Sequence, residues 1–81
     1  MGYSTKNILR LSMEKYELTP GQIKKLRKTL KLTQTEFGEI IGVAKQAVIY
    51  WEKGKHKPIP GFRRAIVDLA KEKGIDLDGD E

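Results

Sequence analysis

The sequence predicts an all-α fold, a bundle of four to five short helices in one small domain. Three observations predict it. Between residues 19 and 73, apolar residues recur at helical offsets of three and four. Two segments read Thr-x-x-Gln or Thr-x-x-Glu, the capping box that starts a helix. Glycines stand where the helical patterns end, as left-handed C-terminal stops do.

Length and cysteine content limit how the domain can be stabilised. The 81 residues leave room for one small domain with a thin core. The chain contains no cysteine, which excludes both a disulfide framework and a thiolate zinc site. Packed helices must therefore supply the stability.

The charge favours an anionic partner, nucleic acid before membrane. The formal net charge is +5, but residues 1–73 hold all 16 basic and only 7 of the 11 acidic residues, a net of +9. Residues 74–81 carry −4. No apolar run approaches the roughly 20 residues of a membrane span, and no continuous apolar stretch follows Lys6 and Arg10 as in a signal peptide. We expect a cytoplasmic protein with no membrane contact.

Residues 1–18 form an N-terminal arm whose structure the pattern does not define. Its apolar residues mix a period of two with helical offsets, so a strand and a short helix are both open. These residues are Ile8, Leu9, Leu11, Met13, Tyr16 and Leu18. We consider the arm a candidate for dimerisation or partner binding.

The first clear helix starts at the capping box of Thr19 and Gln22, with Pro20 at the first helical position. Its apolar stripe consists of Ile23, Leu26 and Leu30. It must stop near Lys31, because the capping box of Thr33 and Glu36 begins the next helix. That second helix is expected to bury Phe37, Ile40 and Ile41 and to end at Gly42.

A third helix fits residues 45–52, where Val48 and Trp51 lie three apart, and ends at Lys53-Gly54. A basic loop with two prolines covers residues 55–60. The last helix, about 61–73, places apolar side chains at helical offsets and closes at Gly74. Those side chains are Phe62, Ile66, Leu69 and Ala70. We therefore expect a domain over residues 19–73 and a disordered acidic tail over 74–81.

Two short helices around a glycine-centred turn, on a basic domain, are the pattern of a helix-turn-helix. Counted from Gln34, the fifth position must be small because the second helix crosses there, and it is Gly38. The ninth must allow positive φ, and it is Gly42. The fourth, eighth, tenth, fifteenth and eighteenth should be apolar, and they are Phe37, Ile41, Val43, Val48 and Trp51. An unrelated α bundle would meet several of these constraints by chance, but rarely both glycines.

The stretch LTQTEFGEIIGVAKQAVIYWEKGKHKP resembles the Xre/Cro-type phage-repressor family of DNA-binding domains. The resemblance covers roughly residues 20–69 and is most specific at Leu32-Thr33-Gln34 and at Trp51-Glu52-Lys53-Gly54. It implies a lambda-repressor-like helix-turn-helix bundle. It also implies an ion pair between Arg27 and Glu52. We expect this pair to fix the packing register of the helices more than to be a large source of stability. A weaker resemblance is to the DNA-binding part of HigA- and MqsA-type antitoxins.

The resemblance implies how the domain would contact DNA. The second helix of the motif would lie in the major groove with its N-terminal residues at base edges. The expected base contacts are Ala44, Lys45, Gln46, Ile49 and Tyr50. The expected phosphate contacts are Gln34, Lys53, Lys55, His56 and Lys57. Ala44 departs from the family, which usually carries Ser or Thr as the helix N-cap there, and loss of such a cap costs about 0.5–2 kcal/mol.

The function expected from these residues is that of a sequence-specific DNA-binding transcriptional regulator, a repressor acting as a homodimer. A single module buries roughly 600–1,000 Å² on DNA, and specific affinity usually needs two. One alternative is an antitoxin whose N-terminal arm binds a toxin. Another is a scaffold that bridges transcription proteins without reading bases.

We expect no cofactor, no metal and no enzymatic activity. The chain has no phosphate-cradling glycine loop, Ser4 and Ser12 have no nearby His and Asp pair, and His56 stands alone among lysines.

Overall fold

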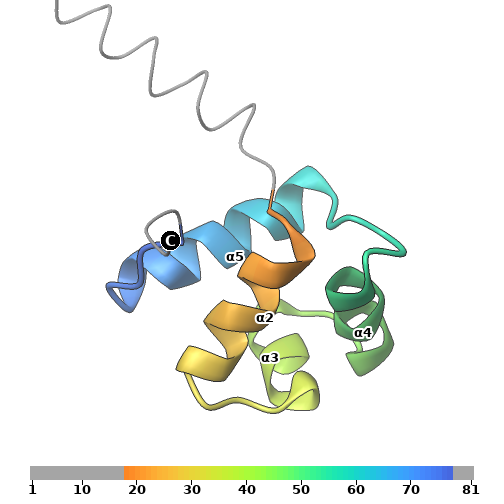
Figure 1. Cartoon of the computed structure of the whole chain (residues 1–81), viewed down its shortest axis with the longest axis horizontal. Coiled ribbons are helices and arrows are strands. Elements are labelled where there is room, and N and C mark those ends of the chain that lie inside the picture. The colour runs from red at the N-terminus through yellow and green to blue at the C-terminus, as the bar shows by residue number, and fades with distance from the viewer. Residues whose placement is uncertain (1–17, 78–81) are drawn as a thin grey trace, which may run out of the picture.

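In the part of the chain that the structure describes, four short helices pack around one core. The computed structural model describes residues 18–77. The helices are α2 (Pro20–Thr29), α3 (Gln34–Ile41), α4 (Lys45–Lys53) and α5 (Pro60–Glu72). In Figure 1, α5 lies along one side of the bundle, and α2, α3 and α4 gather beneath it. The predicted all-α bundle is confirmed, and the described residues contain no strand.

Both predicted capping boxes are formed. The Thr19 hydroxyl accepts a hydrogen bond from the Gln22 amide at 3.0 Å, and the Gln22 side chain accepts from the Thr19 amide at 3.0 Å. Thr33 and Glu36 do the same at 3.0 and 2.9 Å. Each box satisfies amides that the first turn of a helix leaves without an intrahelical partner. The starts of α2 and α3 are therefore encoded locally.

The core draws on every helix. Its buried side chains are Leu18, Ile23, Leu26, Phe37, Val48, Trp51, Ile66, Leu69, Ala70 and Leu77. Ile40 is a correction, because it is 53% exposed where we expected burial. The buried face of α3 includes Phe37 and Gly38. Ile40 is rotated by about 200° from Gly38 and lies about 60° from Phe37 on the side away from Gly38, so it stands at the edge of the buried face.

The C-terminal segment is a second correction. Gly74 has φ +72°, and the amides of Gly74 and Ile75 bond the carbonyls of Lys71 and Ala70 at 3.1 and 2.8 Å. This is a Schellman motif, which turns the chain back onto the helix. Leu77 is consequently buried, and its carbonyl accepts from the Gln22 side chain at 3.1 Å. The folded region thus reaches Leu77 instead of ending at residue 73, because Leu77 and the partly buried Ile75 pack against the core despite their acidic neighbours.

The rest of the acidic tail and residues 1–17 of the arm lie outside the described residues. None of the helices within residues 18–77 is long and apolar enough to cross a membrane.

Candidate nucleic-acid interface

Gly38 lies within α3, on the side of the helix that contacts the turn leading to α4. A Cβ at this position would lie 2.6 Å from the carbonyl oxygen of Val43. The Gly38 carbonyl also accepts hydrogen bonds from the amides of Gly42 and Val43, at 2.7 and 2.8 Å. The close neighbour is therefore the backbone of the turn, whereas we had expected the second helix itself. A glycine is required here because there is no space for a side chain.

Gly42 is required for a different reason. It caps α3 with φ +102° and ψ 29°, a left-handed conformation that L side chains rarely adopt. A Cβ here would meet no atom within 4 Å. The constraint is purely conformational, and it directs the chain into α4, whose Val48 and Trp51 are buried in the core.

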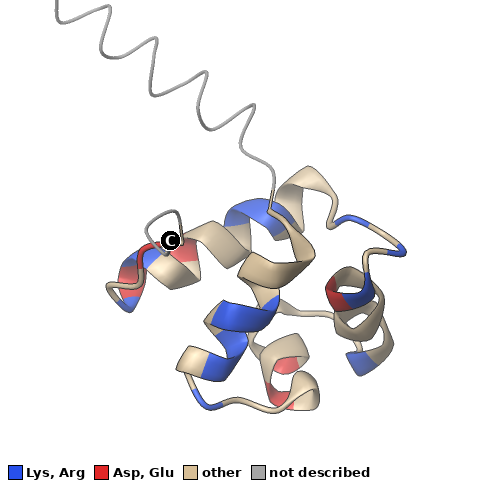
Figure 2. Ribbon diagram, in the orientation of Figure 1, with Lys and Arg blue, Asp and Glu red and all other residues tan. Residues whose placement is uncertain are grey.

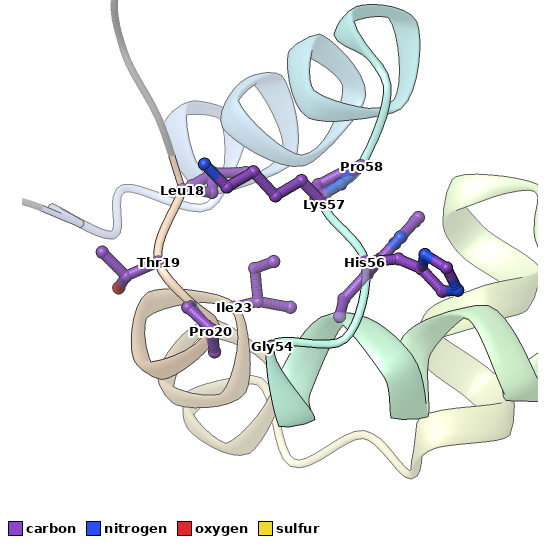
Figure 3. Close-up of a pocket in the computed structure, with 9 residues that line it drawn as sticks. Leu18, Thr19, Pro20, Ile23, Gly54, His56, Lys57 and Pro58 are labelled. Carbon is purple, nitrogen blue, oxygen red and sulfur yellow. The ribbon is translucent and has the colours of Figure 1, made fainter.

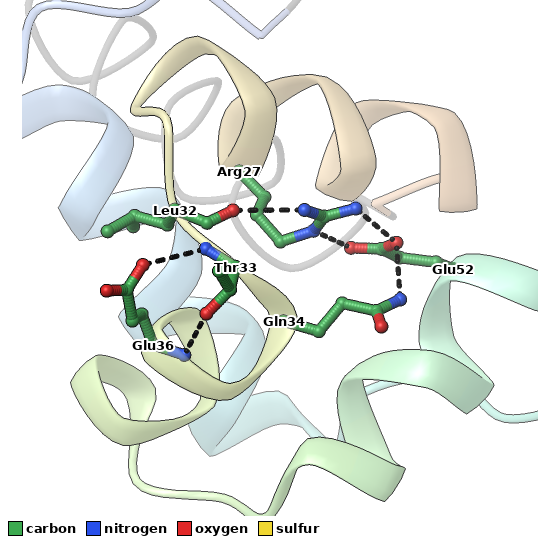
Figure 4. Close-up of polar contacts among 6 residues, drawn as sticks. All are labelled: Arg27, Leu32, Thr33, Gln34, Glu36 and Glu52. Carbon is green, nitrogen blue, oxygen red and sulfur yellow. Dashed lines mark hydrogen bonds and ion pairs between the residues drawn. The ribbon is translucent and has the colours of Figure 1, made fainter.

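An ion pair joins α2 to the end of α4 (Figure 4). Arg27 Nε donates to Glu52 Oε2 at 2.6 Å, and a second guanidinium nitrogen donates to Glu52 Oε1 at 3.0 Å. The third nitrogen donates to the carbonyl of Leu32 at 3.0 Å, in the turn before α3. The two side chains are only 12% and 5% exposed. The pair that the family resemblance implies is thus present, and it ties the helix-turn-helix to α2.

The pKa of Arg27 is raised above its ordinary value by the hydrogen bond to Glu52, against an opposing effect of burial. Stability that a cation gains in this way is lost only as the pH rises through the raised pKa. For an arginine, this pKa lies at strongly alkaline pH, so Arg27 stays protonated near neutrality.

Gln34, an expected phosphate contact, is the first residue of α3 and is half-buried. Its side-chain amide nitrogen donates to Glu52 Oε1 at 3.2 Å (Figure 4). The sequence did not predict this bond, because the two residues are 18 positions apart and only the packing of α3 against α4 brings them together.

The expected base contacts divide into two groups. Ala44, Lys45 and Gln46 are exposed at the start of α4, whereas Ile49 and Tyr50 are half-buried. Ala44 is the N-cap, and its side chain makes no capping hydrogen bond. The exposed start of α4 therefore offers Lys45 and Gln46 as side chains that can reach a base edge.

The expected phosphate contacts after α4 lie on its exposed end and on the loop to α5. These are Lys53, Lys55, His56 and Lys57. The His56 ring packs against the Tyr50 ring in a tilted arrangement, with the ring centroids 5.0 Å apart and an interplanar angle of 53°. Lys55 Nζ lies 6.0 Å from the centroid of the same ring. Tyr50 thus holds the basic loop against α4, a contact that no local pattern in the sequence could indicate.

The charges are distributed unevenly over the fold. Figure 2 shows Lys and Arg at both ends of α4, on the loop that follows it, on α2 and on α5. Acidic residues lie on α3, at the end of α4 and, mixed with basic residues, toward the C-terminal end of α5. The Glu36 carboxylate on α3 is already engaged in the capping box. The surface around α4 is therefore suited to a polyanion.

A cavity of about 240 Å³ lies between the start of α2 and the loop after α4 (Figure 3). Its lining is mostly apolar and includes Leu18, Pro20, Ile23 and Trp51. The Lys57 side chain crosses its edge, and the His56 ring points away from it. The residues around the cavity thus include two of the expected phosphate contacts, His56 and Lys57, but none of the expected base contacts. No group of three or more potential metal ligands gathers within residues 18–77.

The sequence model of a family described as helix-turn-helix matches residues 23–66, more than half of the chain. The matched region begins in α2 and ends in α5, so it contains the glycine-centred turn and all of α4. No curated protein and no solved structure matches the chain.

Proposed function

The chain belongs to the Xre/Cro-type helix-turn-helix family of DNA-binding regulators, and we propose that it is a sequence-specific transcriptional repressor that binds its operator as a homodimer. One observation carries the proposal. The start of α4 exposes Lys45 and Gln46, while buried Val48 and Trp51 fix the same helix on the core. A rigid helix with an exposed polar start is what insertion into the major groove requires.

The base contacts follow from the chemistry of the exposed side chains. Gln46 can bond the N6 and N7 positions of adenine with both ends of its amide, and Lys45 can donate to guanine O6 or N7. Each well-formed bidentate contact is worth about 1–3 kcal/mol of discrimination. Ala44 is small enough to lie against the groove, and Ile49 is one turn further along α4, where it would contact a thymine methyl. Tyr50 is in contact with the His56 ring, so its first role would be to hold the loop.

The phosphate contacts are the exposed basic residues that follow Tyr50. Lys53, Lys55 and Lys57 would neutralise phosphates, and His56 and Gln34 would add hydrogen bonds. Three neutralised phosphates per protomer would give a slope of log affinity against log salt near −2.7 per protomer. These contacts set orientation and bind all sequences alike.

A homodimer would place two recognition helices on an inverted repeat, with half-sites about 34 Å apart. The antitoxin alternative would use the same α4 surface and add a toxin-binding arm. Nearly all of that arm lies outside the described residues, so no contact in residues 18–77 favours it.

Selection of duplexes from a randomised pool tests the proposal. The protein is expected to enrich an inverted repeat with half-sites one helical turn apart, and to bind it with a steep salt dependence. A pool that stays random after repeated selection, or binding that is insensitive to salt, would contradict sequence-specific recognition.

A further inference from the structure

Side chains from α2 and α3 meet at the carboxylate of Glu52 on α4. Glu52 on α4 accepts from Arg27 on α2 through both of its oxygens, and from Gln34 on α3 through Oε1 (Figure 4). With a side chain only 5% exposed, Glu52 is almost completely shielded from solvent. The carboxylate is therefore shared between a structural cation and a residue at the DNA-facing start of α3.

The shared carboxylate fixes which way the Gln34 amide points. A carboxylate only accepts hydrogen bonds, so the nitrogen of Gln34 must face it. A phosphate likewise only accepts, and Nε2 carries a second hydrogen. A Gln34 amide that was free to rotate would present its oxygen to the phosphate part of the time. Held by Glu52, it presents a donor.

The same arrangement creates an electrostatic problem that Arg27 solves. A phosphate oxygen bonded to the second hydrogen of Gln34 would lie about 5 Å from Glu52 Oε1, given ordinary hydrogen-bond geometry. Two anions at that separation repel each other. Salt screens this repulsion only partly, because the separation is well within a Debye length. The bidentate guanidinium of Arg27 neutralises Glu52 at 2.6 and 3.0 Å. Glu52 can then orient Gln34 without repelling the DNA backbone.

We propose that Glu52 is a positioning residue for a phosphate contact made by Gln34, and that Arg27 neutralises the carboxylate so that the phosphate can approach. The inference rests on the proposed function, since it assumes that the chain binds DNA. It adds a role in binding to a pair that otherwise only fixes the packing of α2 against α4.

The direction in which Glu52→Gln changes the affinity for DNA distinguishes positioning of Gln34 from a simple effect of charge. Glu52→Gln removes a negative charge near the DNA, so charge alone predicts tighter binding to every duplex. Loss of positioning predicts weaker binding, since the ionic acceptor of Gln34 is gone. A hydrogen bond of this kind corresponds to an affinity change of about threefold to tenfold. We expect Glu52→Gln to weaken binding by that factor.

A double-mutant cycle measures whether the effect passes through Gln34. Affinity for the selected duplex is measured by fluorescence anisotropy for the wild type, Glu52→Gln, Gln34→Ala and the double variant. Each is studied below its own melting temperature, so that only folded protein is compared. We expect each single variant to lose about threefold to tenfold in affinity. If Glu52 acts through Gln34, the double variant should lose no more affinity than Gln34→Ala alone. Gln34→Ala combined with Lys55→Ala is the control, and those two losses should multiply.

A second measurement needs no variant. In the free wild-type protein, the side-chain amide of Gln34 should be restrained on the nanosecond scale in NMR relaxation, whereas that of exposed Gln46 should be mobile.

Tighter binding by Glu52→Gln, losses that multiply in the cycle, or a Gln34 amide as mobile as that of Gln46 would each overturn the inference and leave the proposed function intact. A wild-type protein that binds no duplex would overturn both.

Discussion

Gly38→Ala tests the geometry on which the helix-turn-helix depends. The added methyl would lie 2.6 Å from the Val43 carbonyl oxygen, a distance that real Cβ atoms essentially never show. The turn cannot simply move away, because the amides of Gly42 and Val43 are bonded to the Gly38 carbonyl at 2.7 and 2.8 Å. Relief must come from a backbone shift that stretches those bonds.

The magnitude follows from three effects. Overpacking costs about 1–3 kcal/mol, and a backbone obstacle places this site at the upper end. A weakened hydrogen bond adds about 1 kcal/mol. Alanine returns about 1 kcal/mol through its higher helix propensity. The net destabilisation is about 3 kcal/mol, which lowers the melting temperature of a domain of this size by about 12–24 °C.

Thermal unfolding followed by circular dichroism measures this effect, with Gly61→Ala as the matched control. Gly61 also lies in a helix, but a Cβ there meets nothing within 4 Å and its φ is not positive. That variant should melt at or slightly above the wild-type temperature. If Gly38→Ala melts together with Gly61→Ala, the close approach of the turn is not a constraint and the reasoning fails.

Three further substitutions test single features. Gly42→Ala should destabilise by about 1–3 kcal/mol in urea unfolding through backbone strain alone, and an unchanged midpoint would contradict the left-handed cap at φ +102°. Ala44→Ser should add the missing N-cap of α4 and stabilise by about 0.5–2 kcal/mol; no rise in melting temperature would show that the cap cannot form. Leu77→Ala should cost about 2 kcal/mol, at the low end for a buried leucine near a chain end, whereas wild-type stability would exclude residues 74–77 from the folded domain.

The elements that could be predicted from the sequence are those encoded by neighbours in the chain. The two capping boxes need only residues three apart, and the stops at Gly42 and Gly54 need only a conformation that glycine adopts. The same local rules place Val48 and Trp51 on the buried face of α4. The Arg27–Glu52 pair came from the family resemblance, since residues 25 apart share no local pattern.

The features that were missed depend on packing in space. Ile40 looked buried because it is three residues after Phe37, but the orientation of α3 is set by the turn against Gly38. Leu77 was assigned to a tail because its neighbours are acidic, yet the Schellman motif after α5 returns it to the core. The tilted contact between the His56 and Tyr50 rings depends on the path of a loop. Charge and periodicity contain no information about such paths.

The specificity of binding tests the central claim most directly, that the start of α4 reads bases and the following loop holds phosphates. The measurement is the ratio of affinities for the selected duplex and a random duplex, at one salt concentration, for wild type, Gln46→Ala and Lys55→Ala. We expect Gln46→Ala to lower this ratio by about 5- to 150-fold, the equivalent of 1–3 kcal/mol, with little change in binding to random DNA. Lys55→Ala should weaken both duplexes equally and reduce the salt slope by about 1. Equal losses on both duplexes for Gln46→Ala would contradict the assignment of α4 as the recognition helix.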